Sequence, residues 1–198
     1  MLRKSLKARP DRGRRVKSPV PSVVPMTTSI DILDDGFGRI RDTVAAALDG
    51  IDPELLTARV DPGANTIAWL VWHLTRVQDD HVADAAGSEQ VWLSGGWAER
   101  FGLPFAPDAT GYGQSSADVG RVAGPGVTAE SLLGYHDAVR AATGSYLRTL
   151  DDAALDRVVD EHWNPPVTLA VRLVSVFSDD LQHAGQAAYA RGALERRA

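Results

Sequence analysis

The chain has 198 residues, of which 44% are hydrophobic, and a net charge of −5. This length favours one domain, and no apolar run reaches the roughly 18 residues that a membrane-spanning helix needs. Cysteine is absent, which excludes disulfides and thiolate metal ligands and favours a cytoplasmic location. Any thiol chemistry would therefore need a thiol supplied from outside the chain.

Positive charge is concentrated at the start of the sequence. Residues 1–25 hold eight lysines and arginines against one aspartate, which leaves thirteen basic and twenty-five acidic residues in the rest. An acidic body repels phosphate backbones, so we expect no nucleic-acid binding by the folded part. The basic segment has four prolines and no apolar periodicity, which predicts disorder.

Two interpretations of this basic tail remain open. It either contacts nucleic acid or another anionic surface, or it lies upstream of the native start of translation. We favour the second interpretation, in which Met26 is the true start and the domain comprises residues 26–198.

The first half of the domain contains two amphipathic segments. Apolar residues recur every three or four positions over residues 29–48, which predicts a helix that ends before Gly50. A second helix is predicted over residues 65–86, with Asn65 as N-cap and Gly87 as stop.

The second half begins with a long connection over residues 88–127. Its glycines, prolines and aromatic residues predict a packed lid rather than a free linker. A third helix is expected over residues 128–150 and a fourth over residues 168–191, with Gly192 as its stop. The sequence shows no clear strand pattern. The fold class is therefore all-α, a four-helix bundle with a long aromatic loop between its second and third helices.

The fourth helix carries polar side chains on one face. Asp179 and His183 are four residues apart and so share that face. If it meets the face of the second helix that holds His73, the three side chains form a metal site with open positions for water or substrate. Zinc suits this donor set best, and nickel or ferrous iron also fit.

Supporting groups surround this predicted site. Gln186 would orient a ligand or a bound water, and Asp80 or Arg76 would hydrogen-bond a ligating group.

A purely structural interpretation competes with the metal site. Carboxylate–imidazole pairs four residues apart are also common on solvated helix faces, and a histidine between apolar neighbours, such as His73, is often a core residue. For the remaining histidines, His81, His136 and His162, we favour structural roles. No G-x-S-x-G motif and no phosphate-binding glycine loop is present.

Two stretches of the chain resemble a known family. "NTIAWLVWHLTRVQDDH" and, about 110 residues later, "DDLQHAGQAAYARG" are similar to motifs of the DinB-like four-helix bundle superfamily, in its branch of mycothiol-dependent enzymes. The resemblance implies that His73, Asp179 and His183 are the metal ligands. At position 179 the family more often has His or Glu, so a shorter carboxylate stands at this ligand position.

The resemblance also implies a cofactor and partners. Mycothiol, a low-molecular-weight thiol, would bind the cation as a thiolate and attack a small-molecule electrophile in a detoxification reaction. The aromatic loop, with Trp92, Trp97 and Tyr112, would help to form the pocket for the sugar and the electrophile. Relatives are typically intracellular, and many form homodimers.

The function that follows is a metal-dependent transferase that uses mycothiol as its nucleophile. One alternative is a non-catalytic DinB-like stress or binding protein. Another is a metal-dependent isomerase or hydrolase with bound water as the nucleophile.

Overall fold

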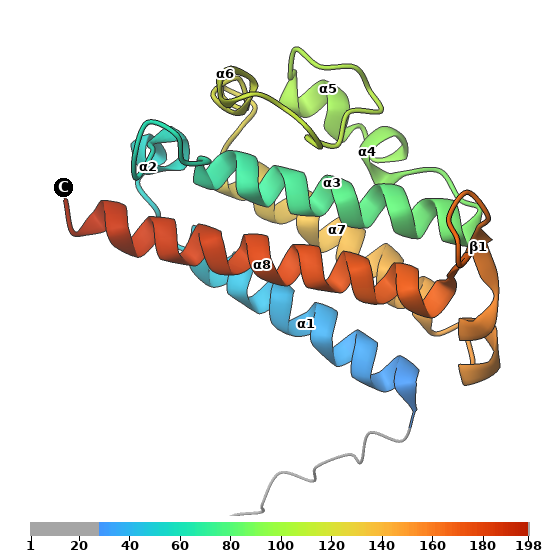
Figure 1. The fold of residues 1–198 in the computed structure, drawn as a ribbon. Coiled ribbons are helices and arrows are strands. Elements are labelled where there is room, and N and C mark those ends of the chain that lie inside the picture. Colours follow the sequence, from blue (N-terminus) through green and yellow to red (C-terminus); the bar gives the residue numbers. More distant parts are fainter. Residues whose placement is uncertain (1–27, 198) are drawn as a thin grey trace, which may run out of the picture.

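The computed structural model describes residues 28–197 and confirms the predicted all-α bundle (Figure 1). The four long helices are α1 (Ser29–Leu48), α3 (Ile67–Ala86), α7 (Ala129–Leu147) and α8 (Leu169–Glu195). The predictions for residues 1–25 and for a start at Met26 lie outside the described residues. None of the described helices combines the length and the apolar character needed to cross a membrane.

Short elements occupy the connections. They are the helices α2 (Pro53–Thr57), α4 (Val91–Ser94), α5 (Trp97–Phe101) and α6 (Ser116–Val119), the 3-10 helix η1 (Asp152–Asp156), and the strands β1 (Val158–Asp160) and β2 (Val167–Thr168). The strands form an antiparallel pair in which Val158 lies opposite Thr168. The sequence did not predict this pair, because strands of two and three residues are too short to show an alternating pattern.

Helix direction explains the long connection between α3 and α7. Gln78 donates to Thr143, and the Tyr146 hydroxyl donates to the carbonyl of Ala85. Later residues of α3 therefore lie beside later residues of α7, so the two helices run parallel. The chain must therefore return along the bundle between them. Residues 88–127 make this crossover above α3 (Figure 1), and bundles with long crossover connections are an established variant of this architecture.

Threonine begins each long helix. The hydroxyls accept from the backbone N–H three residues on, which satisfies one of the free N–H groups of the first turn; the caps are Thr28, Thr66, Thr128 and Thr168. The prediction of Asn65 as the N-cap of α3 was one residue early. Gly87 ends α3 in the left-handed conformation, as predicted.

Two predicted helix ends were wrong. The third helix ends at Leu147 rather than at residue 150. The fourth passes through Gly192 and continues to Glu195, because Ala193 and Leu194 are buried in the core and Arg191 forms an ion pair with Glu195 at 2.7 Å.

The crossover is a packed lid, as its aromatic residues predicted. Trp92 is 4% exposed and lies against the rings of Phe101 and Tyr135. Asp79 on α3 accepts from the backbone N–H groups of Val91 and Trp92 and from the Tyr135 hydroxyl, at 2.7–2.8 Å. A buried carboxylate therefore holds the start of the lid.

Arg76 holds the far part of the same lid. Its fully buried guanidinium donates to the carbonyl of Ala109 at 3.1 Å and to the Tyr135 hydroxyl at 3.3 Å, and it lies 3.5 Å from the Asp79 carboxylate. Arg76 and Asp79 thus link the start and the middle of the lid to α3 through one buried ion pair.

A buried histidine in the core, His136 on α7, gives the bundle a pH-dependent stability. The Thr75 hydroxyl donates to the carbonyl of Val71, so the Nδ1–H of His136 donates to the Thr75 oxygen at 3.0 Å. Burial lowers the pKa of His136 to about 4. The imidazole is therefore neutral in the folded protein, as the structural role predicted for it requires.

Acidification should destabilise the bundle through His136. Between pH 6.5 and 4 the unfolded chain binds a proton that the folded chain does not, so stability falls as the pH falls. From pH 7 to pH 5 we expect a loss of about 2 kcal/mol from this group. His136→Asn, which keeps a hydrogen-bond partner for Thr75, should remove that part of the slope of the unfolding free energy against pH. Urea unfolding at the two pH values measures it. An unchanged slope would contradict the assignment.

Candidate metal centre

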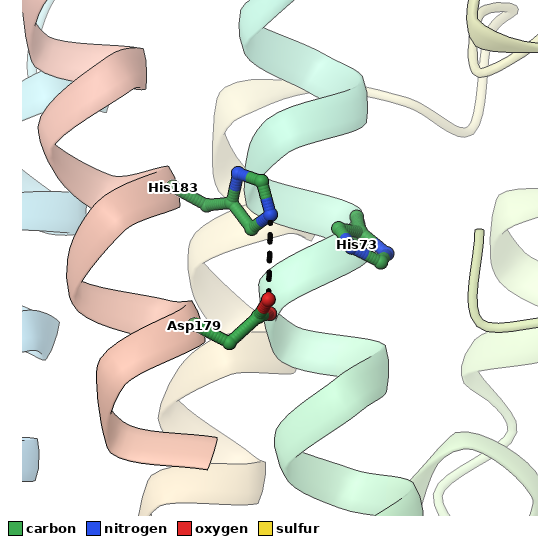
Figure 2. Close-up of side chains that lie close together, drawn as sticks. All are labelled: His73, Asp179 and His183. Atoms are coloured by element: carbon green, nitrogen blue, oxygen red, sulfur yellow. Dashed lines mark ion pairs between the residues drawn. The ribbon is translucent and has the colours of Figure 1, made fainter. Parts of the chain in front are cut away.

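The three predicted ligands converge between α3 and α8. His73 comes from the middle of α3, and Asp179 and His183 come from successive turns of α8 (Figure 2). One donor atom from each residue lies within 4.8 Å of the others. The Nε2 of His183 is 3.6 Å from the Asp179 carboxylate. The antiparallel packing of α3 and α8 thus brings together residues more than 100 positions apart.

Hydrogen bonds fix which nitrogen each imidazole presents to the centre. His73 Nδ1 lies 2.6 Å from the carbonyl of Thr110, which can only accept, so Nδ1 carries the proton. His183 Nδ1 lies 2.8 Å from the side-chain oxygen of Gln186 and donates in the same way. Both Nε2 atoms therefore keep a free lone pair, which is the arrangement found in metal-ligating histidines.

Burial and charge also fit a cation. His73 is 5% exposed, and burial lowers its pKa, with a smaller opposing contribution from the Thr110 carbonyl. The imidazole is therefore neutral and able to coordinate at neutral pH. The Oδ2 of Asp179 is buried, and no described residue hydrogen-bonds to it. A buried carboxylate oxygen without a donor is destabilising, and a bound cation would remove that penalty.

Two imidazole nitrogens and one carboxylate oxygen form a donor set that suits zinc, and nickel or ferrous iron as well. The residues present thus fit a divalent cation with open positions for a further ligand.

The lid closes one side of the centre. Trp69 stacks on His73 with ring centroids 4.5 Å apart, and its indole N–H donates to Gln114 of the lid at 2.8 Å. Gly111 has a φ of 95°, and a Cβ there would lie 2.8 Å from His73 Nδ1. Only glycine allows the Thr110 carbonyl to approach the imidazole in this conformation.

The predicted supporting residues divide into two groups. Gln186 lies at the centre, where it orients His183. Asp80 instead accepts from Gln90 at 2.7 Å, and its other oxygen is 3.7 Å from His81. Arg76 does not contact the candidate ligands directly. It donates to the carbonyl of Ala109, the neighbour of Thr110.

The aromatic residues predicted to form a cofactor pocket have different surroundings. Trp92 and Trp97 lie in the lid and pack against Tyr135 of α7. Tyr112 is 92% exposed and follows Gly111 in the chain. A contribution of these three residues to cofactor binding stays a prediction.

Sequence reasoning missed two residues at the centre, Thr110 and Gly111. Thr110 acts through its backbone carbonyl, which no side-chain motif reveals. The one available signal was the glycine beside it, because glycine permits close backbone approach.

Two pockets lie on either side of the centre along α3 and α8. The hairpin pocket, of about 720 Å³, lies where the end of α3, β1 and the start of α8 meet; its polar walls include Asp80, His81, Asp84, Asp160, Glu161 and Arg172. The α2-side pocket, of about 620 Å³, lies towards the C-terminal end of α8 and is lined by residues that include Val60, Leu70, Gln182, Gln186 and Tyr189. Their walls differ in polarity, although both pockets open onto the same pair of helices.

Comparison with known proteins gives a solved structure of similar fold and a family. A solved structure similar to this chain is the crystal structure of a conserved protein from Enterococcus faecalis, with 28% identity and a TM-score of 0.77, over 85% of this chain and 98% of that chain. No curated protein matches the sequence. The family model described as mycothiol S-transferase matches residues 33–196, a span that includes His73, Asp179 and His183. The chain therefore belongs to the mycothiol S-transferase family, which is DinB-like in fold.

Proposed function

We propose that the protein transfers mycothiol to an electrophilic small molecule, with a divalent cation, preferentially zinc, held by His73, Asp179 and His183. The observation that carries the proposal is that one donor atom from each of these three residues lies within 4.8 Å of the others. Both imidazoles carry their proton on Nδ1, and Asp179 Oδ2 is buried without a hydrogen-bond partner among the described residues. When bound, such a cation would lower the pKa of a coordinated thiol so that it is a thiolate near neutral pH.

Each residue of the centre has a separate task in this proposal. The Thr110 carbonyl and Gln186 keep the protons of the two imidazoles on Nδ1. Asp179 supplies the negative charge. Trp69 and the lid limit access of water to His73 from one side. The thiolate sulfur forms a bond with the electrophilic carbon, the leaving group departs with its electron pair, and the thiol proton passes to solvent.

Removal of the metal tests the proposal. Protein purified without chelators should contain about one equivalent of metal per chain and should conjugate mycothiol to monobromobimane faster than the uncatalysed reaction. Treatment with EDTA should abolish this rate, and addition of zinc should restore it. Turnover of an electrophile without any thiol would instead support a hydrolase or isomerase. Full metal occupancy without turnover of either kind would support a binding protein.

A further inference from the structure

The hairpin pocket and the metal centre both involve residues of α3 and α8. Arg172 precedes Asp179 by seven residues, two helical turns, and therefore lies about 10 Å away on the same face of α8. On α3, His81 follows His73 by eight residues, or about 12 Å. The Arg172 guanidinium donates to His81 Nδ1 at 2.7 Å, and both residues line the pocket. The pocket thus begins roughly 10 Å from the ligands.

The walls of the hairpin pocket are acidic and disfavour anions. Four carboxylates line it, those of Asp80, Asp84, Asp160 and Glu161, against the single guanidinium of Arg172. That guanidinium is already paired with Asp160 at 3.0 Å. An anion would therefore be repelled. Ala83 and Val159 are the only apolar residues among those that line the pocket.

A neutral ligand with many hydroxyl groups fits these walls. Carboxylates accept from hydroxyls in charge-assisted hydrogen bonds, and Arg172 can donate to a hydroxyl or ring oxygen. The volume of about 720 Å³ lies within the range of small-ligand sites. It is large enough for two linked six-membered rings.

We infer that the hairpin pocket binds the sugar–cyclitol half of the thiol cosubstrate while its sulfur lies at His73, Asp179 and His183. This inference rests on the proposed function. Mycothiol joins a cysteinyl thiol to a glucosamine–inositol pair through an amide, so from standard bond lengths its two rings extend from about 5 Å to about 15 Å from the sulfur. The distance of the pocket from the ligands falls in this interval.

The α2-side pocket then remains for the electrophile. It includes Gln186, which contacts His183 directly, and it has apolar walls at Val60 and Leu70. The sugar–cyclitol half of the thiol and the electrophile would then lie on opposite sides of the metal centre.

The thiol-free N-acetylglucosaminyl–inositol pseudodisaccharide, which keeps the amide and is neutral, is the probe for a direct test. It should bind the full-length protein in calorimetric titration both before and after EDTA treatment, and it should compete with mycothiol in the conjugation assay. Asp84→Ala and Glu161→Ala change exposed side chains, so the fold should persist. Each should weaken binding of the probe, and raise the KM for mycothiol, about tenfold, with the KM for monobromobimane unchanged.

Gln182→Ala, an exposed residue in the α2-side pocket, is the matched control and should leave the affinity for the probe unchanged. An active enzyme whose KM for mycothiol is unaffected by both carboxylate substitutions would overturn the inference and leave the proposed function intact. Conversely, carboxylate-dependent binding of the probe by a protein without transferase activity would support the pocket and refute the proposed function.

Discussion

His183→Ala should reduce the metal content from about one equivalent per chain to a trace and should abolish thiol transfer. Loss of one of three ligands removes a direct bond to the cation and leaves Asp179 facing His73 alone. The affinity for metal should fall by well over 100-fold, because even the loss of an outer hydrogen-bond partner weakens metal binding by about 10–100-fold. Emission spectroscopy of the purified variant measures the occupancy, and bimane conjugation measures the activity.

Two companion variants make this result specific. Leu181→Ala shortens an exposed side chain of the same helix and should retain full metal content. Gln186→Ala keeps all three ligands but removes the acceptor that orients His183, so it should show an intermediate loss of about 10–100-fold in affinity. Equal metal occupancy in the wild type and in His183→Ala would refute the metal centre.

Arg76→Met should have the largest effect among residues that do not touch the centre. The substitution leaves the buried Asp79 carboxylate, which is 3% exposed, without its cation. Breaking a buried pair in this way destabilises a protein by about 3–5 kcal/mol. It also frees the carbonyl of Ala109, so the neighbouring Thr110 should hold His73 less firmly. We therefore expect the affinity for metal to fall by about 10–100-fold as well.

A second substitution separates these two effects. In Arg76→Met with Asp79→Asn no uncompensated charge remains buried, but the amide NH2 cannot accept as one of the carboxylate oxygens did. Only part of the lost stability should therefore return in urea unfolding. The affinity for metal should stay low, because the hold on Ala109 is still missing. Recovery of both quantities together would mean that Arg76 contributes only to folding.

The architecture was accessible from the sequence because each long helix buries a stripe of apolar residues with a 3.6-residue period. Part of the candidate ligand set was accessible for the same reason, since Asp179 and His183 share a face by spacing alone. Their meeting with His73 required the packing of α3 against α8, which the resemblance to a known family supplied.

Features that depend on tertiary contacts were not accessible. The partners of Asp80 are Gln90 and His81, and nothing in the spacing of α3 distinguishes a carboxylate that faces the ligands from one that faces the lid. Gly192 remains helical because burial of Ala193 and Leu194 outweighs the modest helix propensity of glycine. Thr110 contributes a backbone carbonyl, which leaves no mark in the sequence other than its glycine neighbour.

The parallel course of α3 and α7 has a consequence for how relatives can diverge. Because residues 88–127 must span the bundle, insertions and substitutions there change the segment that covers His73. Helices α3 and α8, which carry the candidate ligands, can stay unchanged. The β1–β2 hairpin before α8 can change in the same way at the end of α3, without a change in the helices that carry the candidate ligands. Under the proposed function, new substrate preferences could therefore arise by exchange of these two segments, while His73, Asp179 and His183 keep their positions on α3 and α8.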